Sequence, residues 1–392
     1  MHPLHQLLLF AAQQVPHYRS QAWAAKARAG LAFALADVPI TSKQAVNAKV
    51  EAFYAAAVPA SEGRVIEKFT SGSTGVPLRV LKTQRHFQIN AEENQRLSQG
   101  WGRSDHTAVL HTSYAGDGHA PGSITQEQGV GGVTHWTIYT FASRPITDLL
   151  CKVKAPHFNS RPSVVLGALQ EDHDFSFLRL VSTVSEIVSP ELRAAIARWP
   201  RCRHYDSYGT VETGLLAAAC ATCGQYHTAT GHAVIEVLRD DCQPAQPGQH
   251  GRVIVTPLFN LAMPLLRYDL EDYVEVADPR DGCGATRLSF ARIIGRERNL
   301  FKLPEGGRIT PNIPPEDLIA AGIRRYKLIQ TALDEVEFLY IPSDPGAVLA
   351  QDSAQRLIAE HVSARMRVRL DKVTEMPLSK GGKFLMHESR IT

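Results

Sequence analysis

From Arg161 onward, short apolar runs alternate with helix signals, and this alternation constrains the fold more than any other feature of the sequence. The runs at 163–166 and 178–182 are rich in Val and Leu, which is typical of strands buried on both faces of a parallel sheet. Ser189 followed by Pro190 predicts the start of the next helix. Strands and helices in alternation predict an α/β fold with a layered sheet.

The length of the chain indicates more than one domain. At 392 residues it exceeds what a single hydrophobic core usually supports. We expect a large N-terminal domain of α/β layers over residues 1–296, with a β-rich part over 233–290, and a small α+β domain over 297–392. The elements expected in the small domain are helices at 314–321 and 347–366 and strands at 325–331, 335–341 and 367–373.

Composition and charge exclude several classes of protein. The formal net charge is +3, which is too small to indicate nucleic-acid or membrane partners. No apolar stretch approaches the roughly 18 residues that a membrane span requires, and the first residues lack the basic region of a signal peptide. Six cysteines in a chain of this length do not make a disulfide scaffold. These bounds predict a soluble protein of the reducing cytoplasm.

A loop rich in glycine and hydroxyl side chains follows the strand-like run at 65–69. Glycines let backbone N–H groups approach an anion closely, and Ser and Thr hydroxyls add donors at the same place. The loop is therefore a candidate phosphate cradle, although such clusters also form plain turns and the Gly-Lys-Ser/Thr of the common P-loop is absent. Its residues are Thr70, Ser71, Gly72, Ser73, Thr74 and Gly75.

Four later segments follow this loop in a set order. They are Tyr208-Gly209-Thr210-Val211-Glu212, Arg267-Tyr268-Asp269-Leu270-Glu271-Asp272, Gly295-Arg296 and Gly381-Gly382-Lys383. Together they resemble the motifs of the adenylate-forming superfamily, which includes acyl-CoA synthetases, peptide-synthetase adenylation domains and luciferases. Within that superfamily the chain is most similar to the phenylacetate–CoA ligase branch, over about residues 65–385.

This resemblance implies that a carboxylic acid is joined to AMP with release of pyrophosphate. Both reactants are anionic, so the site must neutralise charge. Glu212 would hold Mg²⁺, and Asp272 would accept hydrogen bonds from the ribose hydroxyls. Lys383 would place a mobile cation between the attacking carboxylate and the α-phosphate. The further nucleotide-binding residues that the resemblance implies are Ser185, Glu186, Tyr208, Gly209, Thr210 and Arg296.

The acid pocket is expected among the loops at 111–139 and the strand ends at 183–209. The candidate lining residues, which would suit a flat aromatic acid, are His111, Tyr114, His135, Trp136, Ser185 and Tyr205, and each could instead be a core residue. The family's domain hinge would fall near Arg298, where this chain has Glu297-Arg298-Asn299 in place of the usual acidic pair.

A separate cluster has metal-ligand spacing. Cys220, Cys223 and His227 form a C-x₂-C-x₃-H pattern, and Cys283 could supply a fourth ligand. Thiolates and an imidazole suit a closed tetrahedral Zn²⁺ site with a structural role. Free thiols on a β-hairpin are the alternative.

The sequence therefore predicts a ligase that activates an aromatic carboxylic acid with ATP and Mg²⁺ and then transfers the acyl group to CoA. In one alternative the acyl-adenylate goes to a carrier-protein thiol, an amine or a reductase partner, as in antibiotic biosynthesis of the phenazine type. In another the chain is a non-catalytic nucleotide-binding regulator, although such a protein has no use for Lys383. The identity of the acid and the oligomeric state, a homodimer included, are left open.

Overall fold

The structure is a computed structural model. It describes residues 2–70, 78–98, 101, 107–113, 119–129, 132–284, 287–296, 300–309, 311, 313–378 and 384–391. The chain forms two compact units, and each unit is assembled from two separate stretches of sequence. Unit 1 comprises Met1–Gly102 and Tyr205–Ile293, and unit 2 comprises Arg103–His204 and Ile294–Thr392.

Unit 1 combines a helical N-terminal segment with a mainly antiparallel sheet. Its helices are α1 (Pro3–Gln14), α2 (Pro16–Arg19), α3 (Ala22–Arg28), α4 (Lys43–Ala48) and α5 (Gln84–Leu97). Its strands are β1 (Val65–Phe69), β2 (Arg79–Thr83), β8 (Arg203–Thr210), β9 (Gly214–Ala219), β10 (Tyr226–Thr228), β11 (Ala233–Leu238), β12 (His250–Pro257), β13 (Tyr268–Val276) and β14 (Ser289–Arg296). The strand order is β11-β12-β13-β14-β10-β9-β8, and β1 and β2 form a separate hairpin.

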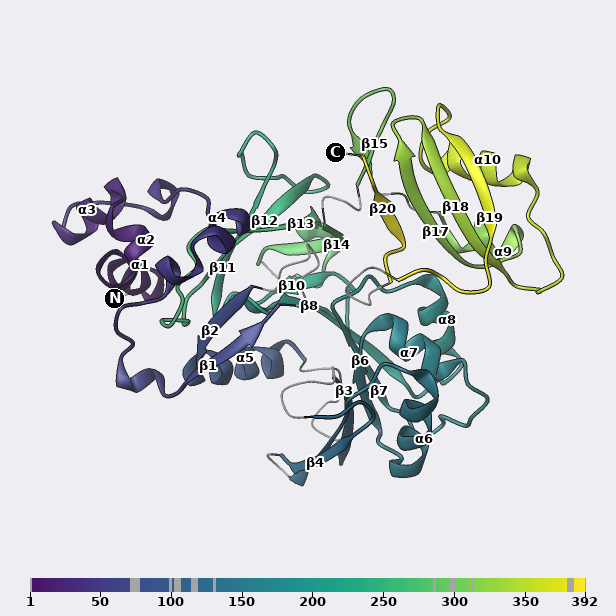
Figure 1. The fold of residues 1–392 in the computed structure, drawn as a ribbon, viewed down its shortest axis with the longest axis horizontal. Coiled ribbons are helices and arrows are strands. Elements are labelled where there is room, and N and C mark those ends of the chain that lie inside the picture. Colours follow the sequence, from purple (N-terminus) through teal and green to yellow (C-terminus); the bar gives the residue numbers. More distant parts are fainter. Residues whose placement is uncertain are drawn as a thin grey trace. The chain divides into compact units, whose positions relative to one another are not determined.

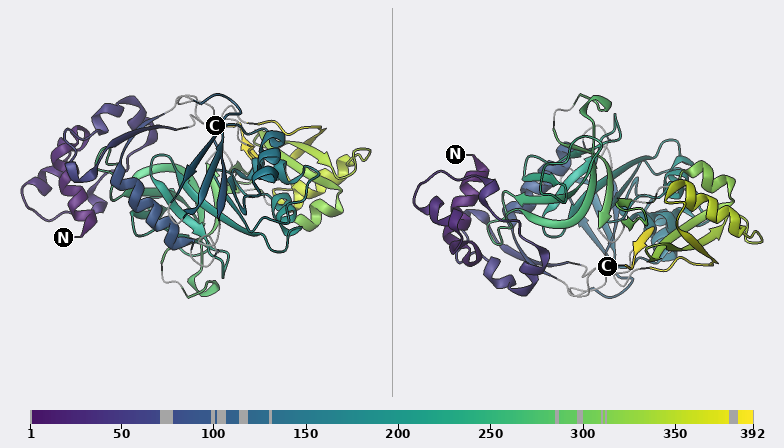
Figure 2. Two further views of the ribbon diagram at one scale, coloured as in Figure 1. Left: turned by 90° about the horizontal axis from the view of Figure 1, so that it is seen from below. Right: turned by 90° about the horizontal axis from the view of Figure 1, so that it is seen from above.

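The core of unit 1 joins the N-terminal helices to this sheet. Helices α1, α2 and α3 lie side by side in all three views (Figures 1 and 2). Leu7 and Leu8 of α1 are buried in the same apolar cluster as Val253 of β12 and Tyr268 of β13. Burial of these side chains is the main force that holds the helices on the sheet.

Unit 2 opens with a largely parallel sheet and three helices. The elements are β3 (Ala108–Thr112), β4 (Ile124–Gln128), β5 (Thr134–Ile138), α6 (Ser143–Val153), β6 (His157–Ser160), α7 (Pro162–Leu169), β7 (Leu180–Val184) and α8 (Pro190–Ala197). The strand order is β7-β6-β3-β5-β4, with only β4 antiparallel to its neighbour among the pairings described. Ser189 caps α8 as expected, because its hydroxyl accepts the Leu192 N–H.

The strand expected at 163–166 is wrong, because these residues lie inside helix α7. A short apolar run does not by itself distinguish a buried strand from a buried helix. Pro162 in the first turn fits the helix, since proline lacks the N–H that this turn leaves unpaired. Strand β7 pairs on one side with β6, whose sequence His-Phe-Asn-Ser contains no apolar run.

The C-terminal part of unit 2 is a four-stranded sheet with two helices. Its elements are β15 (Phe301–Lys302), β16 (Arg308–Ile309), α9 (Pro315–Ala320), β17 (Ile323–Ala332), β18 (Glu335–Pro342), α10 (Gln351–His361), β19 (Arg367–Lys372) and β20 (His387–Ser389). The sheet order is β19-β18-β17-β20, and α9 and α10 accompany it (Figure 1). The expected elements are confirmed, although α10 is shorter than the expected 347–366.

These elements confirm the expected class, an α/β fold with a β-rich part and a smaller α+β unit. Among the helices described, none is long and apolar enough to cross a bilayer.

We predict that Phe338→Ala destabilises the C-terminal sheet. Phe338 of β18 is fully buried in the core that β17 and α10 share, so its truncation leaves a cavity and should cost about 3–5 kcal/mol. Leu333→Ala is the control, because Leu333 lies in the β17–β18 turn with an exposed side chain and should change stability by less than about 0.5 kcal/mol. Urea unfolding of the whole chain measures both, and equal shifts would contradict this description of the core.

Candidate functional site

Glu212 lies in the turn between β8 and β9, and its carboxylate is buried. The Lys43 ammonium lies 3.4 Å from Oε1, and the Tyr268 hydroxyl donates to the same oxygen at 3.4 Å. Within the described part of the chain, Oε2 accepts no hydrogen bond. A buried carboxylate with one oxygen left over suits a divalent cation, which prefers oxygen ligands.

Lys43 reaches Glu212 because Thr41, two residues earlier, is hydrogen-bonded to the chain that leads into β13. The Thr41 N–H donates to the Arg267 carbonyl, the Asp269 N–H donates to the Thr41 carbonyl, and the Thr41 hydroxyl donates to the Leu266 carbonyl, each at 2.9 Å. Helix α4 then starts at Lys43, with Ser42 as its cap. No local motif points to Lys43, because its partner lies 169 residues away.

A second buried lysine is electrostatically coupled to Glu212. Lys82 of β2 is 4% exposed, and its ammonium lies 3.0 Å from Nε2 of His86 on α5. Burial lowers the pKa of Lys82 to about 8, an effect that Glu212 partly opposes and Lys68 reinforces. Burial likewise lowers the pKa of His86 far below its ordinary value, so this ring is neutral and can accept a hydrogen bond from Lys82.

The glycine-rich loop connects β1 to β2, the strand that carries Lys82. Thr70 and Leu78 close its neck, because the Thr70 N–H donates to the Leu78 carbonyl at 3.0 Å and the Leu78 N–H donates to the Thr70 hydroxyl at 2.9 Å. The remaining loop residues of the prediction, Ser71, Gly72, Ser73, Thr74 and Gly75, lie outside the described residues.

Asp272 and Tyr208 lie together in the core of unit 1. The Tyr208 hydroxyl of β8 donates to Oδ2 of Asp272 in β13 at 2.9 Å, and both residues are buried. Gly209 follows Tyr208, and a Cβ there would overlap the Gly214 carbonyl. Glycine at this position therefore allows the close turn that carries Thr210 and Glu212. The hydroxyl oxygens of Thr210 and Thr213 lie 3.0 Å apart.

The predicted residues at the end of β7 belong to unit 2. Ser185 has a left-handed backbone with φ of 78°. Oε2 of Glu186 accepts the Ser163 N–H at 2.9 Å, in the first turn of α7. Glu186 thus caps this helix, an arrangement that the helix dipole favours. Arg296 is the last residue of β14.

The residues predicted to line the acid pocket lie in different parts of the structure. His111 of β3 and His135 of β5 are half-buried, and their ring nitrogens are 3.0 Å apart. Trp136 packs against the apolar cluster of unit 2. Tyr205, in unit 1, is buried and donates a hydrogen bond to Oδ1 of Asn94 at 3.0 Å. Tyr114, Arg298 and Lys383 lie outside the described residues.

The four predicted metal ligands converge in unit 1. The ligand atoms of Cys220, Cys223, His227 and Cys283 all lie within 4.8 Å of one another. Sγ of Cys220 and Cys283 are 3.8 Å apart, and Nε2 of His227 lies 3.5 Å from Sγ of Cys223 and 3.6 Å from Sγ of Cys283. A tetrahedral zinc ion would separate two thiolates by about 3.8 Å and a thiolate from an imidazole nitrogen by about 3.6 Å. The residues present therefore fit zinc.

Comparisons with known proteins find solved structures that resemble this one. No family model matches the chain, and no curated protein matches its sequence. A 2-hydroxyisobutyryl-CoA ligase in the postadenylation state has a TM-score of 0.72 at 18% identity, covering 98% of this chain and 87% of its own. An anthranilate CoA ligase in complex with anthranoyl-AMP gives 0.60 at 14% identity over 82% of this chain and 66% of its own. The amide bond synthetase McbA from Marinactinospora thermotolerans gives 0.55 at 16% identity over 81% and 66%.

The chain has the fold of the adenylate-forming ligases. At these identities the likeness concerns the fold alone.

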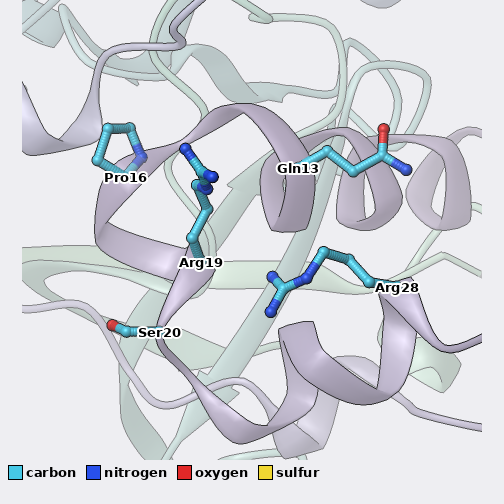
Figure 3. A pocket seen from close by; sticks show the side chains of 5 residues that line it. All are labelled: Gln13, Pro16, Arg19, Ser20 and Arg28. Atoms are coloured by element: carbon cyan, nitrogen blue, oxygen red, sulfur yellow. The ribbon is translucent and has the colours of Figure 1, made fainter.

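One hollow of this adenylate-forming fold was not predicted. It lies among helices α1, α2 and α3, has a volume of about 620 Å³ and is lined by Gln13, Pro16, Arg19, Ser20 and Arg28 (Figure 3). The Arg28 guanidinium donates to the Ala12 carbonyl at 2.8 Å and so ties α3 to α1. All five lining residues are exposed, and none belongs to the predicted site.

We predict that Lys43→Met destabilises the ligase fold, because it leaves the buried Glu212 carboxylate without its nearest cation. Breaking a buried pair costs about 3–5 kcal/mol, and the coupling of Lys82 to Glu212 places the expected loss at the lower end. The double variant Lys43→Met/Glu212→Gln should lose less than the sum of the two single variants. Urea unfolding measures the cycle, with Lys49→Met, at an exposed position, as the control. Additive losses would contradict the pairing.

Proposed function

We propose that the protein activates an aromatic carboxylic acid with ATP. A carboxylate oxygen attacks the α-phosphorus, an O–P bond forms, the bridging bond to the β-phosphate breaks, and pyrophosphate leaves. In the second step a CoA sulfur attacks the acyl carbon, so that a C–S bond forms, AMP leaves and the thiol proton is released. The observation that carries this proposal is the buried Glu212 carboxylate, which is paired with Lys43 and interacts electrostatically with the buried Lys82, in a chain with the fold of adenylate-forming ligases.

In this proposal, several residues help to offset the negative charge of the triphosphate. Glu212 holds Mg²⁺ through its available oxygen, and Lys43 and Lys82 add positive charge around it. Magnesium held there would supply positive charge that offsets the negative charge of the phosphates. The loop from Thr70 to Gly75 binds the β- and γ-phosphates through N–H and hydroxyl donors.

The remaining roles concern the sugar and the reacting groups. Asp272 accepts hydrogen bonds from the ribose hydroxyls, with Tyr208 fixing the position of its carboxylate. Arg296 contacts ribose or phosphate, and Ser185, Glu186, Gly209 and Thr210 line the nucleotide site. Lys383 neutralises charge between the carboxylate and the α-phosphate. The large domain over 1–296 and the small domain over 297–392 would close about a hinge near Arg298 and exclude water.

A second candidate differs in the acceptor of the acyl group. One structural neighbour is named an amide bond synthetase, which favours an amine as the alternative to CoA. Delivery to a carrier-protein thiol or a reductase partner, as in antibiotic biosynthesis of the phenazine type, belongs to the same class. Measuring which acceptor discharges a preformed acyl-AMP on the enzyme separates these outcomes.

We expect wild-type protein to catalyse acid-dependent exchange of pyrophosphate into ATP, and Lys383→Ala to lower the rate at least about 100-fold. ATP affinity should stay within about tenfold, or about 1.4 kcal/mol, because the lysine acts on the reacting groups. Lys380→Ala is the matched control, three residues earlier in the same segment. Undiminished exchange by Lys383→Ala would contradict the assignment, and ATP binding without exchange for any acid would favour a non-catalytic regulator.

We further propose that Cys220, Cys223, His227 and Cys283 hold a structural Zn²⁺ ion. The distances among their ligand atoms support this, and the ion would link the β9–β10 turn to a segment about 60 residues later in the chain. The resulting cross-link would stabilise unit 1.

Metal analysis should find about one zinc per chain in wild-type protein and a loss of metal in Cys220→Ser/Cys283→Ser. Cobalt-substituted protein should absorb in the near ultraviolet through thiolate-to-metal charge transfer. Cys242→Ser is the control, since Cys242 is an exposed thiol outside the cluster. A metal-free wild-type protein of unchanged thermal stability in chelator would refute the zinc site.

A further inference from the structure

One face of the sheet of unit 2 is apolar, and the other carries a row of polar side chains beside Val109 and Leu180. Alternate residues of a strand point to opposite faces, so the pairing register assigns each side chain to a face. His135 of β5 lies opposite Val109 of β3, and His111 of β3 lies opposite Asn159 of β6. His135, His111 and Asn159 therefore share one face. The other face carries Leu110, Trp136 and Phe158, which pack in the cluster that includes residues of α6, α7 and α8.

The three polar side chains form a continuous hydrogen-bonded row across these strands. Nδ2 of Asn159 lies 2.9 Å from Nδ1 of His111. Nε2 of His111 lies 3.0 Å from Nδ1 of His135, and the two rings are nearly parallel, with an interplanar angle of 12°. All three residues are half-buried. A polar row is unusual on a mostly parallel sheet, whose two faces are ordinarily apolar.

The chemistry of imidazole fixes the direction of this row. A neutral imidazole has one donor and one acceptor nitrogen, so a donor at Asn159 makes Nδ1 of His111 an acceptor and its Nε2–H a donor. Nδ1 of His135 then accepts, and its Nε2 carries a hydrogen. Among the described residues this N–H has no hydrogen-bond partner. Within the described ranges, the row thus ends in an available donor.

The backbone of Gly129 lies next to this donor. A Cβ at position 129 would come within 2.6 Å of Cδ2 and Nε2 of His135. Gly129 does not have a positive φ angle, so its backbone does not require glycine. Glycine matters at this position because it leaves room for the His135 ring. Any larger residue would displace the His135 ring and break the end of the row.

We infer that the Asn159–His111–His135 row recognises a polar group on the carboxylic acid, so that the substrate carries a hydroxyl, carbonyl or ring-nitrogen acceptor in addition to its carboxylate. This inference rests on the proposed function and deepens it. Asn159 and His111 are positioning residues, because they set the tautomer of His135. Binding an acid without the acceptor would bury the His135 N–H unpaired, and that penalty provides the discrimination.

The test is pyrophosphate exchange with matched acids that differ by a single polar group. Suitable pairs are benzoate with the three hydroxybenzoates, benzoate with the pyridine carboxylates, and isobutyrate with 2-hydroxyisobutyrate. The polar member of the best pair should have a kcat/KM at least about tenfold higher in wild-type protein. His135→Phe, His111→Phe and Gly129→Ala should each reduce this ratio to within about threefold of unity. His173→Phe, an exposed histidine of the same unit, should leave the ratio unchanged.

A spectroscopic readout distinguishes recognition from a merely structural role. Nitrogen NMR of the imidazoles should show the Nε2–H tautomer for both histidines, and only the preferred acid should shift the His135 signals. A wild-type protein that exchanges several acids without preferring the polar member of any pair would overturn the inference while leaving the proposed function intact. Equal losses for both members of a pair in the variants would also overturn it. Absence of exchange with every acid would overturn both.

Discussion

A buried carboxylate that is paired with one buried lysine and interacts electrostatically with a second is the constraint around which unit 1 is arranged. Glu212, Lys43 and Lys82 are each less than a tenth exposed, so each has lost most of its hydration. A buried ion pair rarely stabilises a fold more than well-packed apolar residues of the same size would. This buried ionic group therefore adds little to the stability of the fold. Residues that weaken stability in this way are expected at functional sites.

The same constraint explains how the neighbouring segments are held. The chain before α4 hydrogen-bonds to the start of β13, and this places Lys43 over Glu212. Thr70 and Leu78 close the neck of the loop that leads into β2, and β2 carries Lys82. Backbone hydrogen bonds thus fix the points from which two flexible lysine side chains extend. With the backbone already ordered, fixing each lysine costs only the rotamer entropy of its side chain.

Some features are determined by residues that are close together in the sequence. The cap at Ser189 was predicted in this way and is confirmed. The motif around Tyr208 and Glu212 is equally local, and its role in binding a nucleotide stays a prediction. The structure also brings together Cys220, Cys223, His227 and Cys283, which come from two segments and were expected to cluster. That they hold zinc stays a prediction. Strands β17, β18 and β19 of the C-terminal sheet were predicted from the sequence, whereas the short strand β20 was not.

Contacts across long sequence separations could not be predicted in this way. Lys43 looked like an ordinary residue of a surface helix, and only the register of Thr41 against β13 directs it inward. Asn159 lies in a strand that carries no apolar pattern, while the apolar run after it forms helix α7. The row of His111, His135 and Asn159 depends on strand pairing, which a single sequence does not specify when one face is polar.

The interleaving of the two units has a consequence for how the chain is made. Unit 1 needs residues from both Met1–Gly102 and Tyr205–Ile293, so its first stretch leaves the ribosome before the sheet that its helices cover. Apolar surface on α1 stays exposed until β12 and β13 have been synthesised, which takes on the order of ten seconds or more at about 5–20 residues per second. Nascent chains of this protein should accordingly depend on chaperones during translation, and the dependence should end when the second stretch of unit 1 emerges.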